Sequence, residues 1–276
     1  MARIIAIANQ KGGVGKTTTA VNLASSLAAA EQRVLLIDAD PQGNATSGIG
    51  LSGEELGDTT YDVLLEPTRL PTAVRSAVQF RSLDVLPATP DLAAAEIELV
   101  EREGREGAMR EAIALVADRY DYVLIDCPPS LGLITLNMLV AADALLIPLQ
   151  CEYYALEGIS QLLNTVRLVQ QGPNPSLDID GVLLTMYDAR LNLSRQVAQD
   201  AREFFGPKVF TAVIPRNVRL AEAPSFGKPI ILYDVASVGA QAYLSVAQEV
   251  MARTGRAGRT VSTGNTGNKP VETAAV

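Results

Sequence analysis

The chain has 276 residues, 48% of them hydrophobic, and carries a net charge of −8 at pH 7. A chain of this length can bury a full core, so we expect one large globular domain rather than two small ones. Its longest apolar runs are far shorter than the roughly 20 residues that cross a bilayer, and the run near the N-terminus is too short for a signal peptide. These features argue against a transmembrane protein and predict a cytoplasmic one with no membrane partner.

The residue types limit the chemistry that is available. The sequence contains no histidine, which removes the usual general base at neutral pH. Its two cysteines, Cys127 and Cys151, are too few for a disulfide scaffold, and each lies in an apolar segment where cysteine usually packs as a small core residue. Any catalysis must therefore use carboxylates, lysine, hydroxyl groups and the backbone.

Short apolar runs alternate with longer helical stretches, which predicts an α/β fold with a mostly parallel twisted sheet covered by helices on both faces. Most expected strands lack polar alternation, as strands buried on both faces do. We expect strands at residues 4–8, 34–38, 83–87, 122–126, 144–149, 180–186 and 209–214. We expect helices at residues 16–30, 92–100, 106–119, 132–141, 156–170, 194–205 and 240–253.

The composition changes after residue 253. Residues 254–276 are rich in glycine and threonine and have almost no large apolar side chain. Such a segment cannot bury enough apolar surface to fold. We expect residues 1–253 to form the domain and residues 254–276 to be a disordered tail.

A glycine-rich segment follows the first expected strand and opens the first expected helix. Glycines let the backbone curl around an anion, and the helix N-terminus adds partial positive charge. Lys16 is placed to hold the β- and γ-phosphates, and the Thr17 hydroxyl to ligate Mg²⁺. This context predicts a P-loop NTPase whose nucleotide contacts are Gly12, Gly13, Val14, Gly15, Lys16, Thr17 and Thr18.

Three aspartates end two of the expected strands. Asp38 ends the strand at 34–38, Asp40 lies two residues beyond it, and Asp126 ends the strand at 122–126. In open α/β sheets, ligands bind at the carboxyl ends of the strands, so these carboxylates should face the phosphates. Phosphoryl transfer needs mainly positioning and charge neutralisation, which one carboxylate near the γ-phosphate and others near Mg²⁺ can supply. A turn or helix-cap role is the alternative, and it explains one of these acids more readily than all.

A second lysine, Lys11, lies near the start of the glycine-rich segment. With it the loop resembles the deviant Walker A loop of the ParA/MinD class of ATPases. The resemblance implies that Lys11 reaches across a dimer interface to the partner subunit's nucleotide. It also implies that Asp40 positions or activates the attacking water, that Asp38 supports the metal site, and that Asp126 binds Mg²⁺ through a water. A solvated lysine that only attracts phosphate is the alternative for Lys11.

Segments 40–48, 151–158 and 214–230 resemble the chromosomal ParA/Soj proteins, and the match covers about residues 1–253. The resemblance implies a partition ATPase in the cytoplasm, associated with the nucleoid. ATP with Mg²⁺ produces a homodimer that binds double-stranded DNA nonspecifically, and a ParB-type centromere-binding partner triggers hydrolysis to ADP and release. It also places the adenine pocket at Met186, Pro215 and Asn217, for which an ordinary strand-end turn is the alternative.

The acidic chain contains one locally basic segment. Residues 190–229 hold seven basic and three acidic residues, a balance of +4. Such a surface can neutralise phosphates without contacting base edges. The family's DNA-binding residues correspond to Arg190 and Arg219, with Arg195 and Arg216 in the same segment. A solvated basic face is the alternative.

Three other functions fit parts of the sequence. A membrane-cycling ATPase resembling MinD needs an amphipathic C-terminal helix, which residues 254–276 cannot form. A redox protein resembling nitrogenase iron proteins would share a cluster through two cysteines per subunit, but Cys127 directly follows Asp126 inside an apolar run. A scaffold with a degenerate site is disfavoured because Lys16, Thr17, Asp40 and Asp126 are all present.

Overall fold

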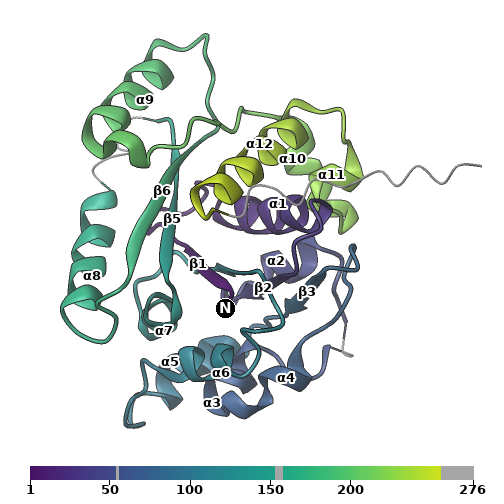
Figure 1. The fold of residues 1–276 in the computed structure, drawn as a ribbon, viewed down its shortest axis with the longest axis vertical. Coiled ribbons are helices and arrows are strands. Elements are labelled where there is room, and N and C mark those ends of the chain that lie inside the picture. The colour runs from purple at the N-terminus through teal and green to yellow at the C-terminus, as the bar shows by residue number, and fades with distance from the viewer. Residues whose placement is uncertain (54–55, 153–157, 256–276) are drawn as a thin grey trace, which may run out of the picture.

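The computed structural model describes residues 1–53, 56–152 and 158–255. The strands of this part of the chain form one sheet with the order β3-β2-β4-β1-β5-β6, and each neighbouring pair is parallel (Figure 1). The strands are β1 (Arg3–Ile7), β2 (Val34–Asp38), β3 (Leu83–Leu86), β4 (Tyr122–Asp126), β5 (Ala144–Gln150) and β6 (Asp178–Thr185). The α/β fold with a parallel sheet is confirmed.

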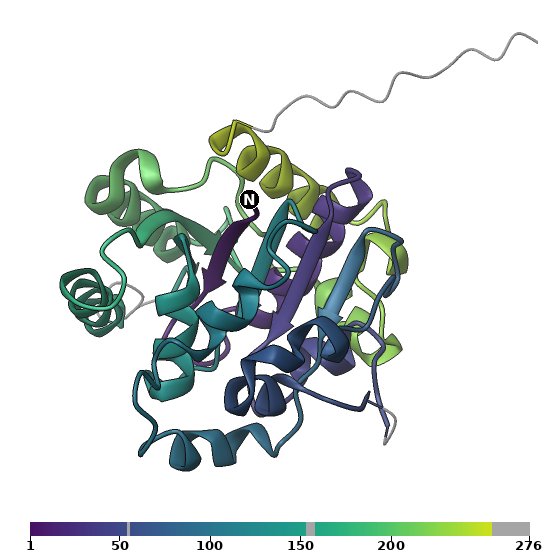
Figure 2. The ribbon, with the colours of Figure 1, turned by 60° about the horizontal axis from the view of Figure 1, so that its bottom comes forward.

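Helices cover both faces of the sheet (Figure 2). The α-helices are α1 (Lys16–Ala29), α2 (Asn44–Gly48), α3 (Thr60–Leu65), α4 (Leu70–Ala73), α5 (Leu92–Glu98), α6 (Ala108–Ala114), α7 (Leu133–Ala141), α8 (Ile159–Gln171), α9 (Asn192–Phe205), α10 (Val218–Glu222), α11 (Ile230–Tyr233) and α12 (Val238–Arg253). Short 3₁₀ turns are η2 (Pro67–Arg69), η3 (Gly206–Lys208) and η4 (Ala223–Phe226). No helix in the described ranges is long and apolar enough to cross a membrane.

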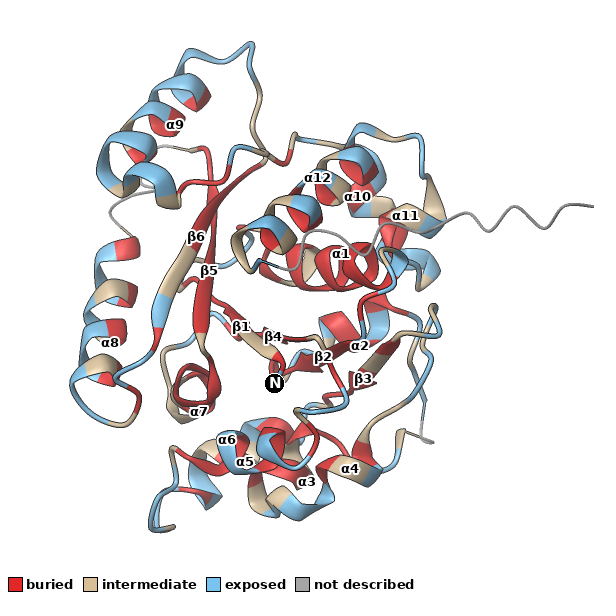
Figure 3. Cartoon of the chain, viewed as in Figure 1, coloured by how far each residue is buried: buried red, intermediate tan, exposed pale blue. Residues whose placement is uncertain are grey.

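The central strands are apolar on both sides because two separate cores enclose them. In β1, Ile5 and Ile7 belong to the core beneath α1 and α12, whereas Ala6 belongs to the core beneath α3 and α5 to α8. Successive side chains of a strand point to opposite faces, so a strand covered on both faces must be apolar throughout. Figure 3 shows the result, with buried residues along the strands and exposed residues on the outer sides of α8 and α9.

Six of the seven expected strands are present, each with bounds within two residues of the expectation. The strand expected at 209–214 is wrong. Isolated bridges at Val209 and Pro215, and backbone hydrogen bonds from Phe210 and Ile214 to β6, join this region to the sheet without forming a continuous ladder. Between them, the N–H groups of Thr211 and Ala212 donate to the Glu249 carboxylate of α12 at 3.0 and 3.1 Å. Because these N–H groups donate to Glu249, they are not available to extend the strand ladder.

The expected helices are present, although that expected at 106–119 is shorter and runs only over Ala108–Ala114. The short helices α2, α3, α4, α10 and α11 were not expected, because segments of four to six residues are too short to show a helical period. Thr254 packs with the domain, since its hydroxyl bonds to the Tyr122 hydroxyl at 2.7 Å. The rest of the predicted tail, residues 256–276, and residues 156–157 of the helix expected at 156–170 lie outside the described residues.

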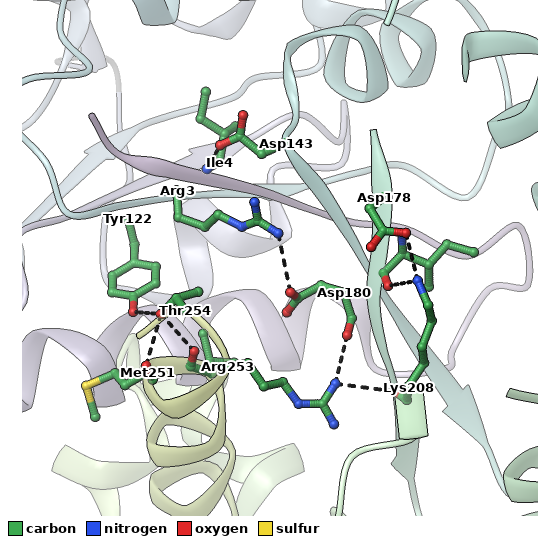
Figure 4. A network of polar contacts seen from close by, with 12 residues as sticks. Arg3, Ile4, Tyr122, Asp143, Asp178, Asp180, Lys208, Met251, Arg253 and Thr254 are labelled. Carbon is green, nitrogen blue, oxygen red and sulfur yellow. Dashed lines mark hydrogen bonds and ion pairs between the residues drawn. The ribbon is translucent and has the colours of Figure 1, made fainter. Parts of the chain in front are cut away.

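Arg253, the last residue of α12, contacts the amino-terminal part of β6, and Figure 4 shows its polar contacts. Its guanidinium donates to the Asp180 carbonyl and to the Glu249 carboxylate, each at 2.7 Å. It also lies over the Phe210 ring, 4.0 Å from the centroid. Gly181 makes room for this ring, because a Cβ there would overlap with it. One side chain of α12 therefore ties the last helix to β6.

We expect Arg253→Ala to lower the free energy of unfolding by about 2–4 kcal/mol, because it removes several hydrogen bonds from a side chain that is only 22% exposed. Urea denaturation measures the loss. Arg69→Ala is the matched control, since it breaks ion pairs whose side chains are all at least 35% exposed, and it should barely move the urea midpoint. Equal shifts in the two variants would contradict the anchoring role of Arg253.

Candidate nucleotide-binding site

The glycine-rich loop joins β1 to α1 at the carboxyl edge of the sheet, where β1 lies between β4 and β5. Gly13 and Gly15 have φ values of 74° and 88°, in the left-handed region that favours glycine. Gly15 is the N-cap of α1, and its position supplies no side-chain hydrogen bond to the helix end. The N–H groups of the first turn, together with the positive end of the helix dipole, can therefore bind an anion.

Lys16 opens α1 and brings a cation to this loop. Its side chain is buried, and its Nζ donates to the Lys11 carbonyl at 3.1 Å. Burial lowers the pKa of the ammonium, while the nearby carboxylates of Asp126 and Asp40 raise it. The loop thus has a desolvated lysine between an anion-binding backbone and two acids.

Asp126 is a buried carboxylate with no hydrogen bond of ordinary geometry. It ends β4 in register with Asp38 at the end of β2, and both residues are fully buried. Neither Asp126 oxygen has a hydrogen-bond partner within the described ranges. Desolvation, and then Asp38, raise the pKa of Asp126 well above its ordinary value, while Thr17 and Lys16 oppose the shift. An uncompensated buried acid is costly, so this position suits a bound cation.

The donor set fits Mg²⁺. The Thr17 hydroxyl lies close enough to the Asp126 carboxyl to lower its pKa, although the two do not form a hydrogen bond of ordinary geometry. Hydroxyl and carboxylate oxygens are the hard ligands that Mg²⁺ prefers. The described residues hold no group of three or more acidic or cysteine side chains that could enclose a metal ion. A cation here would therefore take its remaining ligands from phosphate and water, as Mg²⁺ commonly does.

Asp38 is engaged differently from Asp126. Its carboxylate accepts hydrogen bonds from the Asp40 N–H at 3.1 Å and from the Thr46 N–H and hydroxyl at 2.8 and 2.7 Å. Burial raises the pKa of Asp38 to about 6, against the hydrogen bonds from Thr46. Asp40 is nearly buried, and its own carboxylate accepts from the Gln42 N–H at 3.0 Å. Asp38, which we expected to support the metal, is thus bonded to the loop that carries Asp40.

A pocket of about 360 Å³ lies beside the phosphate loop. Gly15 and Thr18 line it together with Met186, Pro215 and Asn217. Met186 has a φ of 50°, which is uncommon for methionine, and the Asn217 side chain caps α10. The structure therefore brings the three residues expected at an adenine pocket next to the phosphate loop.

Sequence patterns did not single out two further residues of this pocket, Thr185 and Tyr243. The Thr185 hydroxyl donates to the Val14 carbonyl at 2.8 Å, and the Tyr243 hydroxyl lies 3.1 Å from that of Thr19. Both residues come from elements remote in sequence, β6 and α12. No local motif marks them, so only the folded chain identifies them.

Lys11 lies at the surface of the loop. Its ammonium is 3.9 Å from the Glu152 carboxylate, and its side chain is 37% exposed. Glu152 also accepts from the Arg216 guanidinium at 3.4 Å. Lys11 and Arg216, one from the phosphate loop and one from the pocket wall, therefore share one acid.

Most of the arginines expected to bind DNA are paired with acids. The partners are Asp188 for Arg190, Glu152 for Arg216, and Glu222 and Asp234 for Arg219, while Arg195 bonds to Asn192. The Arg190 pair lowers the pKa of Asp188 to about 2. Asp188, Glu152 and Asp234 lie outside residues 190–229, so the charge balance of that segment overstates its positive charge. Arg195 lies on α9 and Arg219 on α10, and both helices lie toward the top of Figure 1.

The segment after the pocket packs closely against α2. A Cβ on Gly50 would lie 2.7 Å from the Gly227 carbonyl. The Gln79 amide bridges the same place, donating to the Ile49 and Gly227 carbonyls at 2.9 and 3.0 Å. The loop of Asp40 and the segment that carries Arg219 therefore meet through α2 and η4.

Comparison with known proteins agrees with this geometry. A family model described as an AAA domain matches residues 2–179. The chain is 57% identical to the chromosome partitioning protein ParA of Myxococcus xanthus, covering 91% of this chain and 88% of that protein. It is 58% identical to the sporulation initiation inhibitor protein Soj of Bacillus subtilis, covering 91% and 99%.

Among solved structures, the chain is similar to one described as cobyrinic acid a,c-diamide synthase from Mycobacterium smegmatis with bound ADP and magnesium. The TM-score is 0.80 at 39% identity, covering 94% of this chain and 97% of that one. The family model covers more than half of the chain, and its relatives match nearly the whole domain. The chain belongs to the ParA/Soj family of chromosome-partitioning ATPases.

Proposed function

We propose that this chain hydrolyses ATP with Mg²⁺, that its ATP-bound homodimer binds double-stranded DNA without sequence preference, and that a ParB-type centromere-binding protein stimulates hydrolysis to ADP and release. Such a protein would associate with the nucleoid. The observation that carries the proposal is the unpartnered, buried Asp126 carboxylate beside Lys16 and the N-terminus of α1. The helix N-terminus and Lys16 supply hydrogen-bond donors and positive charge for the phosphates of a nucleoside triphosphate, and Asp126 supplies an oxygen ligand for its cation.

Different groups of the chain bind the phosphates, hold the cation and orient the attacking water in this proposal. Backbone N–H groups of residues 12–18 and the Lys16 ammonium bind the phosphates and neutralise charge as it moves toward the leaving group. Thr17 and Asp126 would hold Mg²⁺, which polarises the phosphates when bound. Asp40, at the same edge of the sheet, orients the attacking water. With no histidine in the chain, a carboxylate is the group available for this task.

The base occupies the 360 Å³ pocket in this proposal. Met186, Pro215 and Tyr243 contribute apolar walls to it. A purine ring stacks well between such walls, and Asn217 adds an amide at the rim.

The contacts of Lys11 are compatible with a role across a dimer interface. Its ion pair with Glu152 is long and solvated, and pairs of this kind contribute about 0–1 kcal/mol. Lys11 can therefore leave Glu152 and bind a phosphate of the nucleotide on a partner subunit, with little loss of free energy. The dimer would supply the second basic surface that DNA binding needs.

The same short segment serves the base pocket and the DNA surface. Pro215, Arg216 and Asn217 line the pocket, and Arg219 follows directly on α10. Gly227 ties this segment to α2. A nucleotide bound in the pocket is thus one or two residues from the proposed DNA contacts, which supports nucleotide control of DNA binding.

The membrane-cycling alternative depends on residues 254–276, nearly all of which lie outside the described residues. Two assays distinguish these functions. One measures retention on nonspecific DNA with ATP compared with ADP, and the other measures sedimentation with liposomes. We expect ATP-dependent retention on DNA. Sedimentation with liposomes in ATP, without DNA retention, would favour the membrane function instead.

We expect Asp40→Ala to bind ATP normally and to lose ATP turnover by about 100-fold or more, because the attacking water is no longer oriented. Its ATP-bound dimer should persist on DNA. Phosphate release and a fluorescent nucleotide titration measure the two effects. Lys16→Ala is the control, since it should lose nucleotide binding itself, and normal turnover in Asp40→Ala would refute the role of Asp40.

We expect Arg219→Glu to bind ATP with unchanged affinity and to bind nonspecific DNA more weakly, with the salt slope of log K reduced by about one for each phosphate that the variant no longer neutralises. Fluorescence anisotropy over a salt series measures this. Arg69→Glu makes the same charge change between α3 and α4, toward the bottom of Figure 1. If both variants weaken DNA binding equally, net charge rather than this surface is responsible.

We expect Asp126→Asn to raise the melting temperature of the nucleotide-free protein by about 2–8 °C at pH 7, because it removes the cost of a buried, unpartnered acid. The raised folded pKa means that Asp126 favours folding less as pH rises above its ordinary value of 3.8. The advantage of the asparagine variant should therefore grow as the pH rises above 3.8 toward the raised pKa of Asp126 in the folded protein.

Asp188→Asn is the control, because the pKa of Asp188 is lowered whereas that of Asp126 is raised. Its ion pair with Arg190 lowers the pKa of Asp188, so removing that carboxylate should not stabilise the protein. Differential scanning fluorimetry compares the variants, and addition of Mg²⁺ with ADP should stabilise wild type more than Asp126→Asn. A lower melting temperature for Asp126→Asn without nucleotide would contradict the cost assigned to Asp126.

A further inference from the structure

We propose that Thr46 is a positioning residue for ATP hydrolysis, which holds the Asp38 carboxylate and through it the loop that carries Asp40. The inference deepens the proposed function and rests on it. Thr46 is not part of the phosphate loop and contacts no group that we assign to the phosphates or the cation. It acts only through Asp38.

The N–H and the hydroxyl of Thr46 are both hydrogen-bonded within the protein. Its N–H and hydroxyl both donate to Asp38 Oδ2, at 2.8 and 2.7 Å. The same hydroxyl accepts from the Ala88 N–H at 2.9 Å. Thr46 is only 3% exposed, so no water replaces these bonds. One side chain thus joins the end of β2, the helix α2 and the residues just after β3.

The other Asp38 oxygen holds the opposite end of the loop. Asp38 Oδ1 accepts from the Asp40 N–H at 3.1 Å, and the Gly43 N–H bonds back to the Asp40 carbonyl at 2.9 Å. Residues 40–46 therefore leave Asp38 and return to it, with both ends bonded to one carboxylate. Rotation of that carboxylate would displace Asp40, because the Asp40 N–H is one of its hydrogen-bond donors.

The loop has little freedom to adjust by other means. Gly43 has a φ of 61°, and a Cβ there would lie 3.0 Å from the Ala88 carbonyl. The loop therefore runs against the end of β3 at the same residue whose N–H bonds to Thr46. Catalytic groups that move by about 1 Å can lose about 100-fold in rate, so loosening this carboxylate should affect turnover more than binding.

Asp38 and Asp126 therefore have different roles. Asp38 accepts three hydrogen bonds from the loop, whereas Asp126 accepts none within the described residues. Asp126 remains available to the cation, and Asp38 organises the loop. This division modifies the metal-supporting role that the sequence resemblance implied for Asp38.

Thr60 provides a matched comparison. It is fully buried, and its hydroxyl donates to the Asp38 backbone carbonyl at 2.6 Å and to the Pro87 carbonyl at 3.2 Å. Thr60 therefore joins the same strand ends as Thr46 does, but it leaves the Asp38 carboxylate untouched. Loss of its hydroxyl should cost stability without changing the orientation of that carboxylate.

The test compares Thr46→Val, Thr46→Ser and Thr60→Val in the full-length protein. Steady-state phosphate release gives kcat and KM for ATP, a fluorescent ATP analogue gives nucleotide affinity, and scanning fluorimetry gives stability. We expect kcat of Thr46→Val to fall about 10- to 100-fold with KM changed by less than about threefold. Thr46→Ser, which keeps the hydroxyl, should recover most of kcat. Thr60→Val should lose comparable stability and keep kcat within about threefold.

Three results would overturn the positioning role. They are unchanged kcat in Thr46→Val, failure of Thr46→Ser to restore turnover, and an equal loss of kcat in Thr60→Val. If the valine variant does not fold, Thr46→Ala carries the same expectation at a temperature where it is folded. Lack of ATP turnover by the wild-type protein would overturn both this inference and the proposed function, whereas normal wild-type turnover with an unaffected Thr46→Val overturns the inference alone.

Discussion

The site depends on the placement of two carboxylates, Asp38 and Asp126, side by side in the sheet and out of contact with water. Two buried acids repel each other, and each loses hydration, so this arrangement is unfavourable unless other groups compensate. Thr46 and the Asp40 backbone compensate Asp38. Neither Asp126 oxygen has a hydrogen-bond partner of ordinary geometry within the described residues, and the nearby Thr17 hydroxyl and Lys16 ammonium offset its burial only in part. This carboxylate therefore costs the fold stability and remains able to accept a cation.

The order of the strands explains why these groups meet. The chain places β1 at the centre, between β4 and β5, with β2 beyond β4. Since all strands are parallel, the phosphate loop after β1, Asp126 after β4 and Asp38 after β2 open at the same edge. The two apolar cores fix that edge rigidly, because each strand is packed on both faces.

Features that depend on local sequence could be predicted, and those that depend on tertiary partners could not. The phosphate loop and the buried strands follow from glycine spacing and from apolar runs, so their places were right to within two residues. The segment at 209–214 has the composition of a strand, yet Glu249 of α12 binds its N–H groups. Thr185 and Tyr243 carry no motif, and their partners are 171 and 224 residues away in the sequence. Thr46 lies within segment 40–48, but the sequence does not show that its hydroxyl donates to Asp38.

Surface charge has the same dependence on tertiary partners. A charge count along residues 190–229 describes a basic segment, but folding brings Glu152 and Asp234 to its arginines, and Asp188 just before the segment pairs with Arg190. Glu152 is shared between Lys11 and Arg216. If Lys11 turned toward a phosphate, Glu152 would keep Arg216 and the Gln150 amide as partners, so the charge presented beside the base pocket would depend on what the phosphate loop binds. In the proposed function, coupling between nucleotide and surface charge therefore requires no large movement of the fold.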